Sequence, residues 1–219
     1  MEIIIPKNPD LIELRADYLD KISETNYVLN LINFITELTH IPLLFTIRSR
    51  REGGEEISLN EFETLKLIKE VCIKSNVNMI DYELESNYEY VKELITLAKK
   101  EHKEIVLSYH NFNETLKNEE LLEKLIRMEN LGATHAKVAV MPNSQADVFR
   151  LLDVTLIAND QLKIPLTTMS MGEMGKVSRV LGWVYGSHIT FAVGVESSAP
   201  GQIEIEELRK GINSVFNIV

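Results

Sequence analysis

Short apolar runs alternate with longer amphipathic stretches along most of this chain. The stretches place apolar residues at steps of three and four positions, which is typical of helices that bury one face. Short runs that alternate with such helices predict βα units and a parallel sheet. The predicted strands are the following eight runs: Ile3 to Ile5, Leu11 to Leu14, Leu43 to Ile47, Met79 to Leu84, Ile105 to Tyr109, Ala136 to Val140, Leu166 to Met169 and Thr190 to Val193.

The predicted helices include these stretches: Glu61 to Ser75, Tyr88 to Glu101, Glu119 to Leu131, Ala146 to Asn159 and Lys176 to Tyr185. Eight strands with helices between most of them predict an α/β fold of the (β/α)8 TIM barrel type. A chain of 219 residues is small for this fold, whose usual length is about 250, so we expect short loops. The competing architecture, a doubly wound open sheet, favours a glycine-rich turn after its first strand, and Leu11 to Asp17 contains no glycine.

The connection between the first two predicted strands is too short for a complete βα unit. Only Pro6 to Asp10 separates them, whereas a parallel crossover takes about a dozen residues or more. We therefore expect a small barrel with a shortened or missing first βα unit. No repeat and no linker rich in glycine, serine or proline divides the sequence, so residues 1–219 are predicted to form a single catalytic barrel domain.

The composition is that of a globular protein, with 45% hydrophobic and 26% charged residues. A formal net charge of −10 argues against nucleic acid and anionic membranes as partners, so an anionic ligand has to be small and bound by local arginines. No apolar run approaches the roughly 20 residues that a membrane helix requires. Cys72 is the only cysteine, which favours a reducing compartment, and we expect a cytoplasmic protein.

Lys137 stands inside an apolar run, the predicted strand Ala136 to Val140. Strands of a parallel barrel are buried on both faces, so a lysine there is costly unless it is paired or neutral. Burial and cationic neighbours lower the pKa of an ammonium group, which frees an amine that can attack a ketone and form a Schiff base. The alternative interpretation is that Lys137 extends its charged end outward to solvent.

His110 and Glu52 are the other two candidates for catalysis. His110 follows the fifth predicted strand, one strand before Lys137, and a histidine exchanges protons near neutral pH. Glu52 lies in the loop after the third predicted strand and can fix the tautomer of an imidazole and stabilise its protonated form. The alternatives are a loop histidine and a solvated acid in an exposed loop.

Three arginines and two loops are candidates for binding an anion. Arg15, Arg48 and Arg179 each lie beside an apolar run or a glycine turn, where a guanidinium can hold a carboxylate with two hydrogen bonds. The glycine-rich segment Met171 to Arg179 opens a helix and is a weak candidate for a phosphate site. The polar segment Ser197 to Gln202 has the composition of a mobile lid. Each feature alone is also compatible with a surface arginine or an ordinary loop.

Eight segments, taken in order, resemble type I 3-dehydroquinate dehydratase, the Schiff-base enzyme of the shikimate pathway. The resemblance covers nearly the whole chain from about Pro9 onward. The segments are ELRADYL (Glu13 to Leu19), LLFTIRSRREGGE (Leu43 to Glu55), MIDYEL (Met79 to Leu84), VLSYHNF (Val106 to Phe112), AKVAVMP (Ala136 to Pro142), MGEMGKVSR (Met171 to Arg179), GSHITFA (Gly186 to Ala192) and SAPGQI (Ser198 to Ile203).

The resemblance implies a role for each matching residue. Lys137 would form the imine with the C3 ketone of 3-dehydroquinate. His110 would remove a proton from C2 and later help to protonate the leaving hydroxyl, with Glu52 orienting it. Arg179 would bind the substrate carboxylate. The residues that would hold the hydroxyl groups and flank the ring, with the segment from Ser198 to Gln202 as a closing lid, are Glu13, Arg15, Arg48, Ser198 and Gln202. The result would be a syn elimination of water that gives 3-dehydroshikimate.

The implied mechanism requires no metal and no organic cofactor, because a protonated imine accepts the electrons left by proton removal and becomes a neutral enamine. We therefore predict that the enzyme has none. The resemblance also implies a homodimer. It departs from the family at the front, since the family places a strand and a full helix before the segment that begins at Glu13 and only 12 residues precede it here.

Two other functions are compatible with parts of this pattern. A class I aldolase shares the barrel and the lysine nucleophile, but it needs a phosphate site after strands seven and eight, for which Met171 to Lys176 is the only candidate. Arg179 together with the Ser198 to Gln202 segment suits a hydroxylated carboxylate better. A binding protein for such acids without catalysis would retain Lys137, His110 and Glu52 for no purpose.

Overall fold

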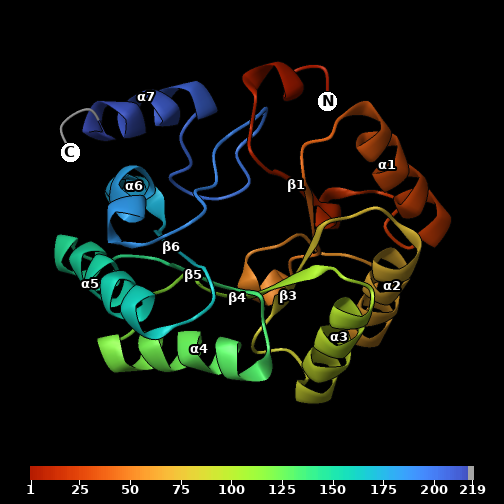
Figure 1. Ribbon diagram of the computed structural model, residues 1–219, viewed down its shortest axis with the longest axis horizontal. Helices are drawn as coiled ribbons and strands as arrows, with labels where there is room; N and C mark the ends of the chain where they lie inside the picture. The colour runs from red at the N-terminus through yellow and green to blue at the C-terminus, as the bar shows by residue number, and fades with distance from the viewer. Residues whose placement is uncertain (217–219) are drawn as a thin grey trace.

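Six parallel strands form one half-barrel sheet in the computed structural model, which describes residues 1–216 (Figure 1). Each strand pairs in parallel with the next one along the chain, so their carboxyl ends meet at one end of the half-barrel. The strands are β1 (Ile12–Arg15), β2 (Leu43–Thr46), β3 (Met79–Glu83), β4 (Glu104–Asn111), β5 (His135–Val140) and β6 (Leu166–Ser170).

Helices follow the strands and cover the outer face of the sheet (Figure 1). The α-helices are α1 (Thr25–Leu38), α2 (Glu61–Lys74), α3 (Tyr88–Lys100), α4 (Asn118–Leu131), α5 (Gln145–Gln161), α6 (Gly172–Leu181) and α7 (Ile205–Phe216). Short 3-10 helices are η1 (Ile5–Lys7), η2 (Ala16–Tyr18), η3 (Arg50–Glu52) and η4 (Gly182–Tyr185). No helix within residues 1–216 combines the length and the apolar character needed to span a bilayer.

Local sequence signals set several helix ends. The helix α2 begins after Asn60, whose side chain accepts from the backbone N–H of Glu63 while the Glu63 carboxylate accepts from the backbone N–H of Asn60. This reciprocal pair satisfies two backbone donors that the first helical turn leaves free. The helix α4 ends at Gly132, whose φ of 100° is a left-handed conformation that glycine adopts without strain.

The side chains of the strands alternate between two environments. The outer set, which includes Phe45, Ile80 and Leu107, packs against the helices in the main core. The inner set is apolar at the amino ends of the strands, where Leu44 and Met79 pack together with Val106. Nearer the carboxyl ends, the inner face carries the polar and charged side chains described below, together with the apolar Ala139 and Met169. The polar site therefore lies above an apolar layer.

Two of the eight predicted strands are wrong. Residues from Ile3 form turns and the 3-10 helix η1, because Pro6 provides no N–H for a ladder and the connection is too short for a crossover. Thr190 to Val193 is not a strand either, apart from one isolated bridge between Val193 and Glu204. The first βα unit is thus missing, and the described chain forms a six-stranded half-barrel in place of eight strands.

Side chains replace the backbone ladder beyond β6. The hydroxyl of Ser187 accepts from the N–H of Thr168 at 3.0 Å, and the hydroxyl of Thr167 accepts from the N–H of Ile189 at 3.2 Å. Only one ladder bridge, between Leu166 and Ser187, remains at this edge. Because these hydroxyls take up backbone donors, the segment that follows leaves the sheet without forming a seventh regular strand.

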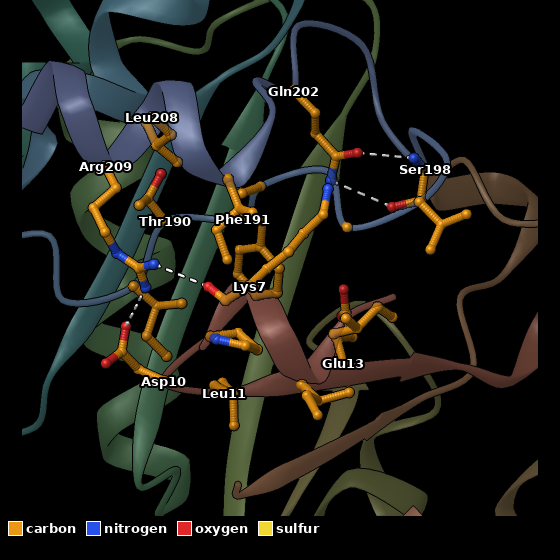
Figure 2. A pocket seen from close by; sticks show the side chains of 18 of the residues that line it. Lys7, Asp10, Leu11, Glu13, Thr190, Phe191, Ser198, Gln202, Leu208 and Arg209 are labelled. Carbon is orange, nitrogen blue, oxygen red and sulfur yellow. Dashed lines mark hydrogen bonds and ion pairs between the residues drawn. The ribbon is translucent and has the colours of Figure 1, made fainter. Parts of the chain in front are cut away.

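The N-terminal segment and α7 lie beside each other across the open side of the half-barrel (Figure 1). Arg209 on α7 donates to the carbonyl oxygens of Lys7 at 3.0 Å and Asn8 at 2.7 Å, and Lys7 forms ion pairs with Glu204 and Glu206. Between these elements, β1 and residues 188–198 lies a cavity of about 820 Å³, which we call the seam cavity (Figure 2).

Candidate active site

A second cavity, which we call the central cavity, lies at the carboxyl ends of the strands and has a volume of only about 40 Å³. It is much smaller than the seam cavity, yet it contains the groups with catalytic potential. All nine site residues predicted from the sequence line it: Glu13, Arg15, Arg48, Glu52, His110, Lys137, Arg179, Ser198 and Gln202. They come from four strands or strand ends, from η3, from α6 and from the loop before α7, so the fold brings together residues that are far apart in the sequence.

Lys137 points into the half-barrel and not outward to solvent. Only 5% of its surface is exposed, and its Nζ lies 3.2 Å from Oδ2 of Asp81 and 3.8 Å from Oε1 of Glu13. The Phe191 ring covers the same nitrogen, with its centre 4.2 Å away. The nearest charged groups to this amine are carboxylates, because β1 and β3 place Glu13 and Asp81 at its level on the inner face.

His110 and Glu52 form a buried pair. Oε2 of Glu52 lies 2.9 Å from Nδ1 of His110 and also accepts from the backbone N–H of His110 at 3.0 Å. A carboxylate that accepts from Nδ1–H leaves Nε2 as the ring nitrogen available to take a proton in the cavity. His110 and Lys137 stand on the neighbouring strands β4 and β5, as the sequence predicted.

The surroundings of this pair favour a neutral imidazole. Burial, and then the positive charges of Arg48 and Lys137, hold the pKa of His110 well below its ordinary value of 6.5. Burial, and then the negative charge of Glu83, raise the pKa of Glu52. Near neutral pH, His110 is therefore free to act as a base. The Glu52 carboxyl group lies at hydrogen-bond distance from any imidazolium that forms.

The loop after β2 places Glu52 inside the protein, where only 3% of its surface is exposed. The Ser49 side chain caps the short helix η3 by accepting from the Glu52 N–H. Gly53 then adopts a φ of 85°, and Gly54 packs so closely that a Cβ there would lie 1.9 Å from the Arg48 carbonyl oxygen. The two glycines of this loop are therefore needed to turn the chain back over the pair.

Arg48 and Arg15 are already engaged by carboxylates. Arg48 is buried, and its Nη2 donates to Oδ1 of Asp81 at 2.7 Å, while Nη1 donates to Ser108 at 2.9 Å and to Glu83 at 3.3 Å. Arg15 forms two hydrogen bonds with Asp17, at 2.8 and 2.6 Å. Both guanidiniums line the central cavity, but neighbouring carboxylates already balance part of the positive charge that each could offer to a ligand.

Arg179 on α6 is a buried cation of a different kind. Its guanidinium donates to the carbonyl oxygens of Phe191 at 3.1 Å and Pro200 at 3.2 Å, and its Nε has no hydrogen-bond partner. It forms no ion pair with any carboxylate of residues 1–216, and burial lowers its pKa to about 10. A buried guanidinium without a counter-ion is suited to an anionic ligand that supplies one.

Ser198 and Gln202 line the central cavity and form hydrogen bonds with each other (Figure 2). Oε1 of Gln202 accepts from the N–H of Ser198 at 2.8 Å, and Nε2 of Gln202 donates to the Ser198 hydroxyl at 3.3 Å. The same loop contacts the start of α6, where the Gly172 N–H donates to the Pro200 carbonyl at 3.1 Å. In this arrangement the loop covers the central cavity, which explains why its volume is small.

Two residues that the sequence analysis gave no role in the site contact its central groups, and a third is buried nearby on β5. Asp81 contacts both Arg48 and Lys137, and Phe191 lines both the central and the seam cavity. His135 is buried on the same face of β5 as Lys137, with its Nε2 2.7 Å from the Thr167 hydroxyl. Alternation along β3 and β5 puts Asp81 and His135 on the inner face, so period-two patterning was a usable signal for both.

The arrangement has the parts for proton transfer beside a carbonyl. It offers an amine for covalent attack, an imidazole and carboxylate pair for proton transfer and an unbalanced buried cation for an acid group. A sequence profile of the family "Type I 3-dehydroquinase" matches residues 1–218. This chain belongs to the type I 3-dehydroquinase family. The 3-dehydroquinate dehydratase of Aromatoleum aromaticum is 43% identical over 210 residues, which cover 95% of this chain and 81% of that relative.

Solved structures of the family agree with this assignment. The crystal structure of 3-dehydroquinate dehydratase from Geobacillus kaustophilus superimposes with a TM-score of 0.96 at 41% identity and covers 99% of this chain and 84% of its own. A type I 3-dehydroquinate dehydratase from Clostridium difficile, solved with covalent modified comenic acid, gives a TM-score of 0.90 at 37% identity, with 97% and 85% covered. The 3-dehydroquinase fold therefore accommodates the six-stranded sheet described here.

Proposed function

We propose that this chain is a 3-dehydroquinate dehydratase that eliminates water from 3-dehydroquinate through an imine on Lys137. One observation carries the proposal: a single cavity holds the buried Lys137 amine, the His110–Glu52 pair on the neighbouring strand, and the buried Arg179 guanidinium without a carboxylate partner. Family membership and the names of the relatives support the same reaction, a hydro-lyase step of the shikimate pathway.

The chemistry follows from these groups. The neutral amine of Lys137 attacks the C3 ketone to give a carbinolamine, which takes up one proton from solvent and loses its hydroxyl as water to give a protonated imine. His110 then removes a proton from C2, and the electron pair of the broken C–H bond moves into the imine to give a neutral enamine. His110 returns this proton to the leaving hydroxyl, which departs as water on the same face. Hydrolysis of the conjugated imine releases 3-dehydroshikimate and restores Lys137.

Substrate binding uses the cations and the loop above the cavity. We infer that Arg179 holds the substrate carboxylate, because this anion would supply the missing counter-ion. Glu13, Arg15 and Arg48 are proposed to contact the ring and its hydroxyls from the strand ends. A cavity of about 40 Å³ is too small for a cyclic acid, so the Ser198 and Gln202 loop has to move for the substrate to enter and to close again afterwards.

Borohydride reduction tests the covalent step directly. Wild-type protein treated with 3-dehydroquinate and borohydride should gain a stable adduct on Lys137, located by peptide mass spectrometry. In a separate assay without borohydride, it should form the conjugated product, which is followed by its absorbance. Lys137→Ala should form neither, whereas Lys100→Ala, which removes an exposed lysine, should behave as wild type. His110→Ala should still be trapped but should not turn over. Turnover by Lys137→Ala, or an adduct elsewhere, would refute the mechanism.

The finer features of architecture and assembly are also proposals. We propose that the sheet is an incomplete (β/α)8 barrel whose open side is covered by the N-terminal segment and α7, in a cytoplasmic homodimer as the family resemblance implies. The sedimentation coefficient of the purified protein tests the assembly, since a dimer has twice the mass of the 25.0 kDa chain.

A further inference from the structure

Strand β3 carries two buried carboxylates that the reaction described above does not use. Asp81 and Glu83 are two residues apart, so both point to the inner face of the sheet, and only 1% and 4% of their surfaces are exposed. A buried charge is costly unless other groups compensate it. Their partners therefore indicate what each carboxylate does.

The two oxygens of Asp81 have separate partners. Oδ1 accepts from Nη2 of Arg48 at 2.7 Å and from the Ser108 hydroxyl at 2.6 Å. Oδ2 lies 3.2 Å from Nζ of Lys137. Ser108 pairs in register with Lys137 across β4 and β5, so the serine that holds Asp81 stands next to the lysine. The two bonds to Oδ1 fix the carboxylate, and this keeps Oδ2 directed at the amine.

Glu83 makes the same kind of contact with Arg48 but does not contact the lysine. Its Oε1 accepts from Nη1 of Arg48 at 3.3 Å and from the Ser49 N–H at 2.8 Å, and its Oε2 accepts from the Ser49 hydroxyl at 2.7 Å. Glu83 thus fixes the loop that carries Glu52. The two carboxylates share a strand, burial and Arg48, and they differ in whether they touch the amine.

We propose that Asp81 is a positioning residue for the Schiff-base reaction: it fixes Nζ of Lys137 and acts as the counter-ion whenever this nitrogen carries positive charge. The inference rests on the proposed function. In the imine, Nζ keeps one proton and a positive charge, and Oδ2 of Asp81 is placed to accept from that N–H. When His110 removes the C2 proton, the electron pair neutralises the nitrogen. Asp81 itself neither gains nor loses a proton in any step.

The charges around Asp81 suit a permanent anion. Burial alone would raise its pKa, but the positive charges of Arg48 and Lys137 hold this pKa below the ordinary value of 3.8. The other titratable groups that face Nζ come from three further strands, with Glu13 on β1, His110 on β4 and His135 on β5. Of the carboxylates, Asp81 makes the shorter contact with Nζ.

A fixed anion beside Nζ has opposite effects on two steps of the reaction. Before the imine forms, it favours the ammonium form of Lys137, which cannot attack a ketone. After the imine forms, it favours the protonated imine, which is the form that accepts electrons from C2. Removal of the Asp81 charge should therefore ease imine formation and slow turnover.

Asp81→Asn and Glu83→Gln form a matched pair for the test. Each removes one buried negative charge that contacts Arg48, and Asp81→Asn alone removes the contact with Lys137. Both variants are first checked for wild-type circular dichroism and cooperative unfolding. Imine formation is then measured by quenching with borohydride at timed intervals between pH 5 and pH 9, and kcat is measured over the same range.

In Asp81→Asn, the acid limb of the imine-formation rate should move to lower pH by about one unit, while kcat at neutral pH falls about tenfold or more. Glu83→Gln should leave the pH dependence of imine formation unchanged, because Glu83 faces Glu52 and not Lys137. A purely structural role would not accelerate one step while slowing another. Equal pH shifts in both variants, or an unchanged kcat in Asp81→Asn, would overturn the proposal.

A second variant keeps the proposal testable where Asp81→Asn does not fold. Ser108→Ala removes one of the two bonds to Oδ1 and leaves the charge in place. It should lower kcat several-fold with little change in KM, and an unchanged kcat would count against Asp81 positioning. Trapping of wild-type protein on Lys137 separates the two proposals. If the wild type is trapped and Asp81→Asn matches Glu83→Gln, the dehydratase mechanism stands and the role of Asp81 is lost.

Discussion

His135 makes the stability of this protein depend on pH in a predictable way. It is the first residue of β5, two positions before Lys137, and only 3% of its surface is exposed. Its Nε2 lies 2.7 Å from the Thr167 hydroxyl, and its ring centre lies 6.4 Å from that of His188. Burial, and then the positive charges of His188 and Lys137, lower the pKa of His135 to about 4.

The sign and size of the effect follow from this shift. An unfolded chain protonates His135 near its ordinary value of 6.5, whereas the folded protein resists protonation down to about pH 4. Below pH 6.5 the unfolded state therefore binds more protons, and stability falls as the pH falls towards 4. Integrated from pH 7 to pH 5, one such group lowers the free energy of unfolding by about 2 kcal/mol.

Urea denaturation at pH 7 and pH 5 measures this loss. His135→Gln should lower the free energy of unfolding at pH 7, since it disturbs a buried contact, but its further loss at pH 5 should be about 2 kcal/mol smaller than that of wild type. The same comparison with His40→Gln gives the effect of replacing an exposed histidine. If His135→Gln shows the same loss between the two pH values as wild type, His135 is not held neutral by its burial.

Three further substitutions test other parts of the site and its frame. Glu52→Gln should lower kcat about 10- to 100-fold because it removes the carboxyl group that lies 2.9 Å from Nδ1 of His110, while borohydride trapping persists; unchanged kcat would contradict the pairing. Gly54→Ala should lower both stability and kcat, because a Cβ would lie 1.9 Å from a backbone oxygen, whereas Gly211→Ala meets nothing closer than 3.4 Å and should do neither. Arg209→Ala should reduce the free energy of unfolding in urea titrations by about 1 kcal/mol, because it removes two hydrogen bonds to the N-terminal segment. It should leave kcat unchanged, because neither bond involves a group proposed for the reaction.

The strands from β2 to β6 were predictable because their apolar runs are largely buried on both faces. The strands β2 to β6 fall within or next to the runs expected for them, and the helix ranges from α2 to α5 agree within a few residues. The proximity of His110 to Lys137 also follows from chain order, since consecutive strands of a parallel sheet are neighbours in this fold. Local pattern was enough for these strands, including β6 at the edge of the sheet.

The open side was not predictable from local pattern. Thr190 to Val193 is apolar enough for a strand, but hydrogen bonds from the Ser187 and Thr167 side chains take the place of the ladder at the edge of β6. The acidic neighbours of Lys137 were missed for a related reason. Alternation shows that Asp81 faces inward, but its contact with the amine depends on the register of three strands and on Ser108 between them.

The open side of the half-barrel lies away from the strands that carry the groups proposed for the reaction. Asp81, His110 and Lys137 stand on β3, β4 and β5, and each of these strands is paired on both sides, so their relative positions do not depend on the edges of the sheet. Apart from Arg48 after β2, the groups proposed to bind the substrate lie at the edges, with Glu13 and Arg15 on β1 and Arg179 and the lid loop beyond β6. Movement of the segments at the open side would therefore change substrate binding more than the relative positions of the groups proposed for proton transfer. A half-barrel with six strands therefore holds the three side chains proposed for the reaction on strands that are paired on both sides.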